Sequence, residues 1–227
     1  MSTTSPRVLT RFIPAVLCCL LVASCGETPL GELPEVPSGD EEPGLLRSLQ
    51  NLHNAAEREP ADAIARGRLG MAYDVNGFPE RAIVVYGQAA ILDGNAFDWP
   101  YFRALLQAHT HTDYEGALAS LDAALAIDDS YVPAWLARGT WLHRLNRPEE
   151  ARTAFDRAAN LGAGAPAMMG IANLYIDAGE FERAVAVLEP LNADTPDARI
   201  DSLLARAYRA LGQEALARVA AARGSVV

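Results

Sequence analysis

The chain has 227 residues and a formal net charge of −10 at pH 7, because 29 acidic residues outnumber 19 basic ones, and half of its residues are apolar. All of the basic residues are Arg. An acidic surface repels phosphate groups, so nucleic acids and anionic lipid headgroups are excluded as favourable partners.

The first 24 residues have the pattern of a bacterial secretory signal peptide. Arg7 and Arg11 give the leading segment its positive charge, and residues 12–23 form a nearly unbroken apolar run. A helix needs about 20 apolar residues to span a bilayer, so this run is too short to span one and suits the core of a signal peptide.

Residues 22–25 read Val-Ala-Ser-Cys and resemble the bacterial lipobox. The resemblance implies cleavage before Cys25 and acylation of that residue, for example with palmitate; an ordinary secretory signal with incidental cysteines is the alternative. Cys18 and Cys19 would leave with the signal, so the mature chain would hold no further thiol for a disulfide or a metal. Gly26 replaces the Asp that retains lipoproteins in the inner membrane under the enterobacterial rule. We therefore expect a lipid-anchored protein of the cell envelope, at the outer membrane and facing the periplasm.

Residues 25–43 are expected to form an acidic, Pro-rich tether. The stretch contains six acidic residues and no basic residue. Such a composition buries too little apolar surface to fold alone. Extended at about 3.1 Å per residue, it would reach roughly 55 Å and hold the rest of the chain away from the membrane.

Residues 44–60 are predicted to form one helix that caps the following domain. Leu45, Leu49, Leu52 and Ala56 recur on one helical face. Terminal units of stacked repeats need a polar outer face, and this segment has one.

From residue 61 to 223 the sequence repeats itself every 33 to 35 residues. We place the repeats at about 63–96, 98–131, 132–164 and 165–197, with a partial copy at 198–223. Each copy has two helix-length apolar patterns separated by a residue suited to positive φ, namely Gly77, Asn146, Gly179 or Gly212. Thr112 stands at this point in the second copy, and a β-branched residue suits positive φ poorly, so we expect a different turn there. A repeat of this length predicts an all-α solenoid of stacked helix-turn-helix units.

The repeated positions resemble the tetratricopeptide repeat. In the third copy these are Trp135, Gly139, Leu142, Asn146, Ala151, Phe155 and Ala158. The resemblance implies a right-handed α-solenoid whose first helices line a concave groove that binds a peptide or a helix. Counted in the family's register, the partner-binding groove would contain Trp99, Phe102, Leu106, His109, Thr140, His143, Arg144, Met169, Asn173, Arg206 and Arg209.

Within this groove, the aromatic residues would form an apolar centre, and Phe102 and Leu106 are equally suited to the core. Asn173 would hold a backbone amide, and the arginines would hold a carboxylate. The family's clamp for chaperone tails needs Lys and Asn in the first repeat, where Gly67 and Met71 stand, so that activity is not expected.

The sequence contains no recognisable catalytic motif, so no catalytic residue, cofactor or resident metal is predicted. It lacks a phosphate-binding Gly-rich loop with Lys, a Gly-x-Ser-x-Gly elbow and a His-Glu-x-x-His helix. His109 and His143 occupy equivalent positions in successive repeats, but a third metal ligand is missing.

We therefore expect a non-enzymatic, membrane-anchored scaffold for protein–protein interactions in the bacterial cell envelope. The alternatives are an accessory subunit of a periplasmic redox or transport system and a structural homo-oligomer formed through the incomplete C-terminal repeat.

Overall fold

Each repeat folds into two helices because its apolar residues recur with helical spacing and a positive-φ residue ends the first helix. The computed structural model describes residues 30–38, 41–194 and 196–225, and every regular element in those residues is an α-helix. This confirms the predicted all-α solenoid of helix-turn-helix repeats. None of the helices described is long and apolar enough to cross a membrane. The helices are α1 (Pro43–Arg58), α2 (Ala63–Val75), α3 (Pro79–Leu92), α4 (Asp98–Thr110), α5 (Tyr114–Ile127), α6 (Val132–Arg144), α7 (Pro148–Asn160), α8 (Ala165–Asp177), α9 (Phe181–Asp194), α10 (Ala198–Ala210) and α11 (Glu214–Gly224).

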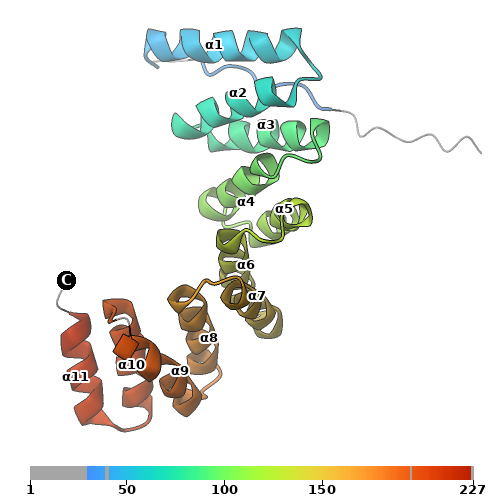
Figure 1. Ribbon diagram of the computed structural model, residues 1–227. Coiled ribbons are helices and arrows are strands. Elements are labelled where there is room, and N and C mark those ends of the chain that lie inside the picture. The colour runs from blue at the N-terminus through green and yellow to red at the C-terminus, as the bar shows by residue number, and fades with distance from the viewer. Residues whose placement is uncertain (1–29, 39–40, 195, 226–227) are drawn as a thin grey trace, which may run out of the picture. The chain divides into compact units, whose positions relative to one another are not determined.

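Each helix packs on its neighbours in the chain, as Figure 1 shows for residues 43–224. We call α2, α4, α6, α8 and α10 the first helices, and α3, α5, α7, α9 and α11 the second helices. The first helices α6, α8 and α10 also contact one another in sequence order. We call their shared surface the first-helix face. Because contacts connect only near repeats, the hydrophobic core is a row of linked clusters.

Small residues allow the two helices of each repeat to approach closely. Ala82, Ala117, Ala151 and Ala184 are completely buried, as the repeat pattern predicts for this position. Phe155 depends on glycine, since a Cβ atom added at Gly139 or at Gly170 would lie 2.6 Å from its ring. The spacing between neighbouring repeats is therefore set by residues with little or no side chain.

The turns between paired helices follow the predicted positive-φ pattern, with one surprise. Gly77 has φ 80° and Asn146 has φ 57°, as expected. Thr112 also adopts positive φ, 51°, so the expectation that it would avoid this region is wrong. Its hydroxyl donates to the His111 carbonyl at 2.6 Å, which compensates part of the strain. The turn still differs from the others, because Asp113 N–H bonds to a carbonyl six residues back, whereas the N–H of Phe78 bonds five residues back.

Residues 31–38, which we call the strap, depart from the expected solvated tether. The strap is extended and lies on α1, α2 and α3. Leu33 and Val36 pack against the core cluster of the first repeat, and Pro37 is buried. Cys25 and the predicted signal peptide lie outside the described residues.

The strap is ordered because the helices supply what its composition lacks. Tyr73, Arg81 and Gln88 donate side-chain hydrogen bonds to its backbone carbonyls. Proline restricts a free chain to extended conformations, so little entropy is lost when the strap docks. The composition argument considered only whether the segment could fold alone, and it missed folding onto a preformed groove.

Candidate functional site

A cavity of about 260 Å³ opens between α6 and α8 on the first-helix face. Its wall combines apolar side chains with hydrogen-bonding groups, which is typical of a peptide-binding surface. Four of the predicted groove residues line it, together with three apolar residues. These are Thr140, His143, Met169 and Asn173, and then Leu136, Phe155 and Pro166.

Helical spacing brings these side chains to one place. Leu136, Thr140 and His143 are four and three residues apart, so they share one face of α6. Met169 and Asn173 are four residues apart on α8, and the Asn173 amide donates to the Met169 carbonyl at 3.1 Å. The absent side chain of Gly170 lets the Phe155 ring reach the floor of the cavity from α7.

A polar network crosses the three first helices beside the cavity. His143 Nε2 lies 2.8 Å from Asp177 Oδ2, and Arg206 Nη2 lies 3.5 Å from Asp177 Oδ1. Arg206 Nη1 also donates to Asn173 Oδ1 at 3.4 Å. Three predicted groove residues, one from each of α6, α8 and α10, therefore meet around one carboxylate.

Asp177 was missing from the sequence-based site, although a signal for it existed. Arg144 was selected by its place near the end of the first helix in the third repeat, and Asp177 stands 33 residues later at the equivalent place. The count therefore located the position, but Asp177 was not selected. Its side chain is 53% exposed, so an approaching ligand has access to it.

The three apolar groove residues of the second repeat lie apart from this cavity. Trp99, Phe102 and Leu106 pack against the core cluster of the first repeat and are partly buried. Trp99 stacks on Tyr86, with ring centroids 6.2 Å apart. It also lies over Gly67, where an added Cβ atom would be 2.3 Å from the ring. This placement gives the three residues a packing role, as the analysis already allowed for Phe102 and Leu106.

The remaining predicted residues flank the network without joining it. His109 and Arg209 are exposed on α4 and α10. Arg144 turns toward α5, where its guanidinium lies 5.7 Å from the centre of the Tyr114 ring.

The chemistry of the site is that of binding. It offers an amide, an imidazole, a guanidinium and a carboxylate around an apolar floor, which together recognise backbone amides and charged groups. Within the described residues, no group of three or more His, Cys, Asp and Glu side chains is placed to hold a metal ion.

Comparison with known proteins agrees with this architecture. Two family models of the tetratricopeptide repeat match residues 108–166 and 162–207. Anaphase-promoting complex subunit 7 of Arabidopsis thaliana is 27% identical over 116 residues, which cover 50% of this chain and 21% of that protein. The chain thus spans about a fifth of that relative.

Solved structures show the same fold. A tetratricopeptide repeat protein from Parabacteroides merdae matches with a TM-score of 0.66 at 22% identity, over 78% of this chain and 70% of that one. YrrB, a tetratricopeptide repeat protein with an unusual peptide-binding site, matches with a TM-score of 0.63 at 19% identity, over 78% and 91% of the two chains. PilF of Pseudomonas aeruginosa matches with a TM-score of 0.59 at 20% identity, over 78% and 81%. Its repeats, its helix pairs and these matches show that the chain belongs to the tetratricopeptide repeat family.

Proposed function

We propose that this protein is a non-enzymatic scaffold, anchored in the bacterial cell envelope by lipid on Cys25, that binds a partner's peptide or helix on the first-helix face. The coarser part follows from the fold, since tetratricopeptide repeats generally serve protein–protein interaction. The observation that carries the finer part is the cavity between α6 and α8 with the His143–Asp177–Arg206 network at its edge.

The network is suited to exchange partners with a ligand. Asp177 holds His143 and Arg206 while the site is empty, and all three side chains are at least 30% exposed. A ligand carboxylate would compete with Asp177 for Arg206, because guanidinium binds carboxylates through two parallel hydrogen bonds. Asn173 would hold the peptide backbone, and Met169 would contact an apolar ligand side chain.

The comparisons support a peptide as the ligand class. YrrB, which shares the fold over most of its length, has a peptide-binding site. For this chain the residues facing such a ligand are its own, and only the architecture is carried over.

Photo-crosslinking in intact cells tests the binding face. Benzoylphenylalanine at the position of Thr140, inside the cavity, is expected to capture one envelope protein. The same probe at Thr153, exposed on α7, is the matched control and is expected not to capture it. A combined Asn173→Ala and Arg206→Ala variant should lose the capture while remaining folded. Equal capture from both positions, or capture that survives the double variant, would overturn the proposed face.

The anchor is proposed from the Val-Ala-Ser-Cys sequence at residues 22–25, and it has a separate test. Cells fed an alkyne analogue of palmitate should label the wild-type protein and leave it in the outer-membrane fraction. Cys25→Ala should abolish both labelling and membrane retention, whereas Cys18→Ala should change neither. An unlabelled wild-type protein would contradict the anchor and leave the binding face untouched.

A further inference from the structure

The strap shows what a groove between two second-helix positions can bind in this molecule. Four hydrogen bonds join it to the helices, and in each one a side chain donates to a strap carbonyl. Gln88 Nε2 donates to the carbonyls of Gly31 and Glu32, both at 2.8 Å, Tyr73 donates to Pro34 at 3.2 Å, and Arg81 donates to Glu35 at 2.9 Å.

This mode of recognition reads the backbone and favours proline. Only carbonyl oxygens are used in these four bonds, so residues without an N–H group are tolerated. Leu33, Val36 and Pro37 face the groove, while Glu32 and Glu35 remain exposed. The groove therefore holds an extended Leu-Pro-x-Val-Pro segment whose acidic side chains point away.

The donors of this groove have counterparts in one other repeat. Gln88 also accepts from Arg66 Nη1 at 2.5 Å, and with Tyr73 these residues form a polar set inside the groove. Adding 135 to each number gives Asp201, Tyr208 and Arg223 in the last repeat. Arg223 Nε bonds to Asp201 Oδ1 at 2.9 Å, so the paired positions are linked in both repeats.

The three middle repeats do not carry this polar set. The same three positions hold Tyr101, Ala108 and Ala123 in the second repeat and Met168, Tyr175 and Pro190 in the fourth. In the third repeat, Arg157 covers the Trp135 ring at 6.0 Å. The set is thus restricted to the two ends of the stack.

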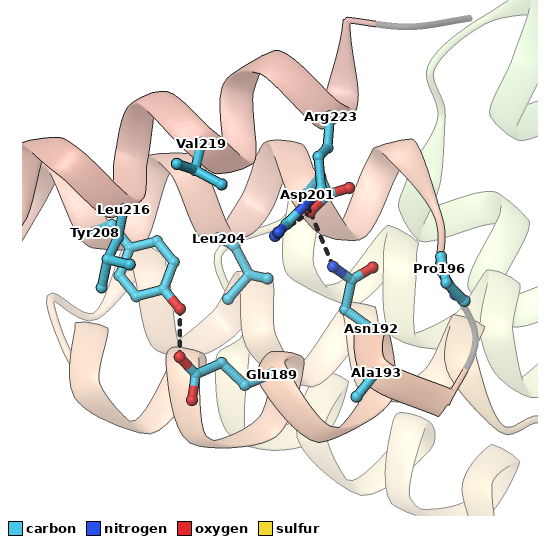
Figure 2. Close-up of a pocket in the computed structure, with 10 residues that line it drawn as sticks. All are labelled: Glu189, Asn192, Ala193, Pro196, Asp201, Leu204, Tyr208, Leu216, Val219 and Arg223. Atoms are coloured by element: carbon cyan, nitrogen blue, oxygen red, sulfur yellow. Dashed lines mark hydrogen bonds and ion pairs between the residues drawn. The ribbon is translucent and has the colours of Figure 1, made fainter.

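The last of these grooves is open in the described structure. A cavity of about 410 Å³ lies across α10 between α9 and α11, and Figure 2 shows Tyr208, Asp201 and Arg223 lining it. Leu216 and Val219 line it from α11 and are 48% and 52% exposed. Pro196, Leu204 and Ala193 complete an apolar surface.

The polar groups of this groove are held ready by partners inside it. Tyr208 donates to Glu189 and Asn192 Nδ2 donates to Asp201 at 2.8 Å, as the dashed lines in Figure 2 mark. Burial, together with the bond to Glu189, raises the pKa of Tyr208 to about 12, so its hydroxyl stays a donor. Arg223 has five N–H groups, engages Asp201 through Nε and Nη2, and is 54% exposed.

We propose that the groove between α9 and α11 binds an extended, proline-containing segment of a partner protein, in the way the groove between α1 and α3 binds the strap. Arg223 would donate to a ligand carbonyl as Gln88 does, and Tyr208 would exchange Glu189 for a carbonyl as Tyr73 bonds Pro34. Leu216 stands 135 residues after Arg81, so the ligand meets an apolar side chain there instead of a cation. With Glu189 and Asp201 also present, the groove favours a segment less acidic than the strap. This site is separate from the first-helix face and does not depend on the function proposed for it.

Peptide binding to the full chain in detergent micelles tests this inference. The probe is the fluorescent peptide Gly-Gln-Leu-Pro-Gln-Val-Pro-Ser, the strap sequence with both Glu residues replaced by Gln. Fluorescence anisotropy should show saturable binding of one peptide per chain. Leu216→Glu, at an exposed position that preserves folding, should weaken binding at least about tenfold because it removes an apolar contact and adds a repelling charge.

Two further variants locate the binding. Ile91→Glu is the matched control, because Ile91 is 56% exposed and lines the groove between α3 and α5, which lacks the polar set. It should leave binding unchanged, whereas Arg223→Gln, which restores the residue of the first groove, should retain binding. Absence of binding at millimolar peptide, or binding that Leu216→Glu leaves unchanged, would overturn the proposal. Concentration-dependent dimers of the wild type that Leu216→Glu abolishes would assign the groove to a second copy instead, which would also overturn it.

Discussion

The first and last repeats of this solenoid have similar sequences and differ in what covers them. The first repeat lies beneath α1 and the strap, and its Leu69, Tyr73 and Tyr86 side chains are at most 1% exposed. In the last repeat, Leu216 and Val219 of α11 are about half exposed. The difference teaches that the repeat alone does not decide whether an end is finished, since the covering segment comes from outside the repeat.

A stacked architecture makes this difference energetically important. Each repeat derives its stability from its own contacts and from its interfaces with its neighbours, so an end with one interface fewer unfolds more readily. We expect the covered end to be the more protected of the two, and substitutions at matched positions measure the difference.

The largest expected effect comes from the matched core pair Leu69 and Leu204, which are 0% and 2% exposed. Leu69→Ala should reduce the free energy of unfolding by about 2–5 kcal/mol through lost burial and a residual cavity. Leu204→Ala should fall in the lower part of this range, because the open end can relax around the cavity. Urea denaturation of the full chain measures both. Ile64→Ala, at a position 55% exposed, is the control and should change stability by about 0.5 kcal/mol or less. Equal losses from Leu69→Ala and Ile64→Ala would contradict the assigned core.

The next effect concerns the contact between Gln88 and the strap. Gln88→Ala should cost about 1–3 kcal/mol, because it leaves Arg66, only 5% exposed, without its acceptor and removes two bonds to the strap. Hydrogen exchange should show faster exchange across residues 31–38. Gln50→Ala, which removes an exposed bond to Asn54 on α1, should leave that exchange unchanged. Unaltered strap protection in Gln88→Ala would show that the carbonyl bonds do not hold the strap.

A smaller effect compares the two equivalent tyrosines. Tyr73→Phe should cost about 0.5–1.5 kcal/mol, because the Pro34 carbonyl loses its donor in a covered groove. Tyr208→Phe should cost about 0.5 kcal/mol or less, since Glu189 can turn to water in the open groove. Melting curves of the two variants give the order, and a larger loss in Tyr208→Phe would reverse the proposed contrast.

The smallest effect is the pH dependence of the last repeat. Side-chain and backbone hydrogen bonds from Arg199 lower the pKa of Asp197, which caps α10, from its ordinary 3.8 to about 2. A lowered folded-state pKa means that this stabilisation is present above about pH 4 and is lost as the pH falls toward 2. Asp197→Asn should flatten the fall in melting temperature over that range. Arg199→Ala should flatten it partly, and an unchanged profile in both variants would contradict the cap.

Much of this fold could be predicted because repetition multiplies weak signals. One glycine or one buried alanine indicates little, yet Gly77, Gly179 and Gly212 at the same place in three copies define the turn and the helix register together. Thr112 shows the limit of this reasoning. Its local preference disagrees with positive φ, and packing of the two adjoining helices prevails.

The site was less predictable, because its partners come from different repeats. Repeat counting selected His143, Asn173 and Arg206, but it could not show that one carboxylate, Asp177, would join them. Nor could it separate these residues from Trp99, which occupies a groove position but fills the gap over Gly67. The strap was out of reach for the same reason, since its order depends on donors from 39 to 57 residues away.

The docked strap also changes the length of the leash on which the scaffold would be held. If Cys25 carries the proposed lipid, six peptide units separate it from Gly31, and a chain of that length spans at most about 20 Å. With residues 31–43 released, the same anchor would allow roughly 60 Å. A protein that captured the strap would therefore give the repeats a threefold longer reach from the membrane, and so allow the scaffold to contact partners farther across the envelope.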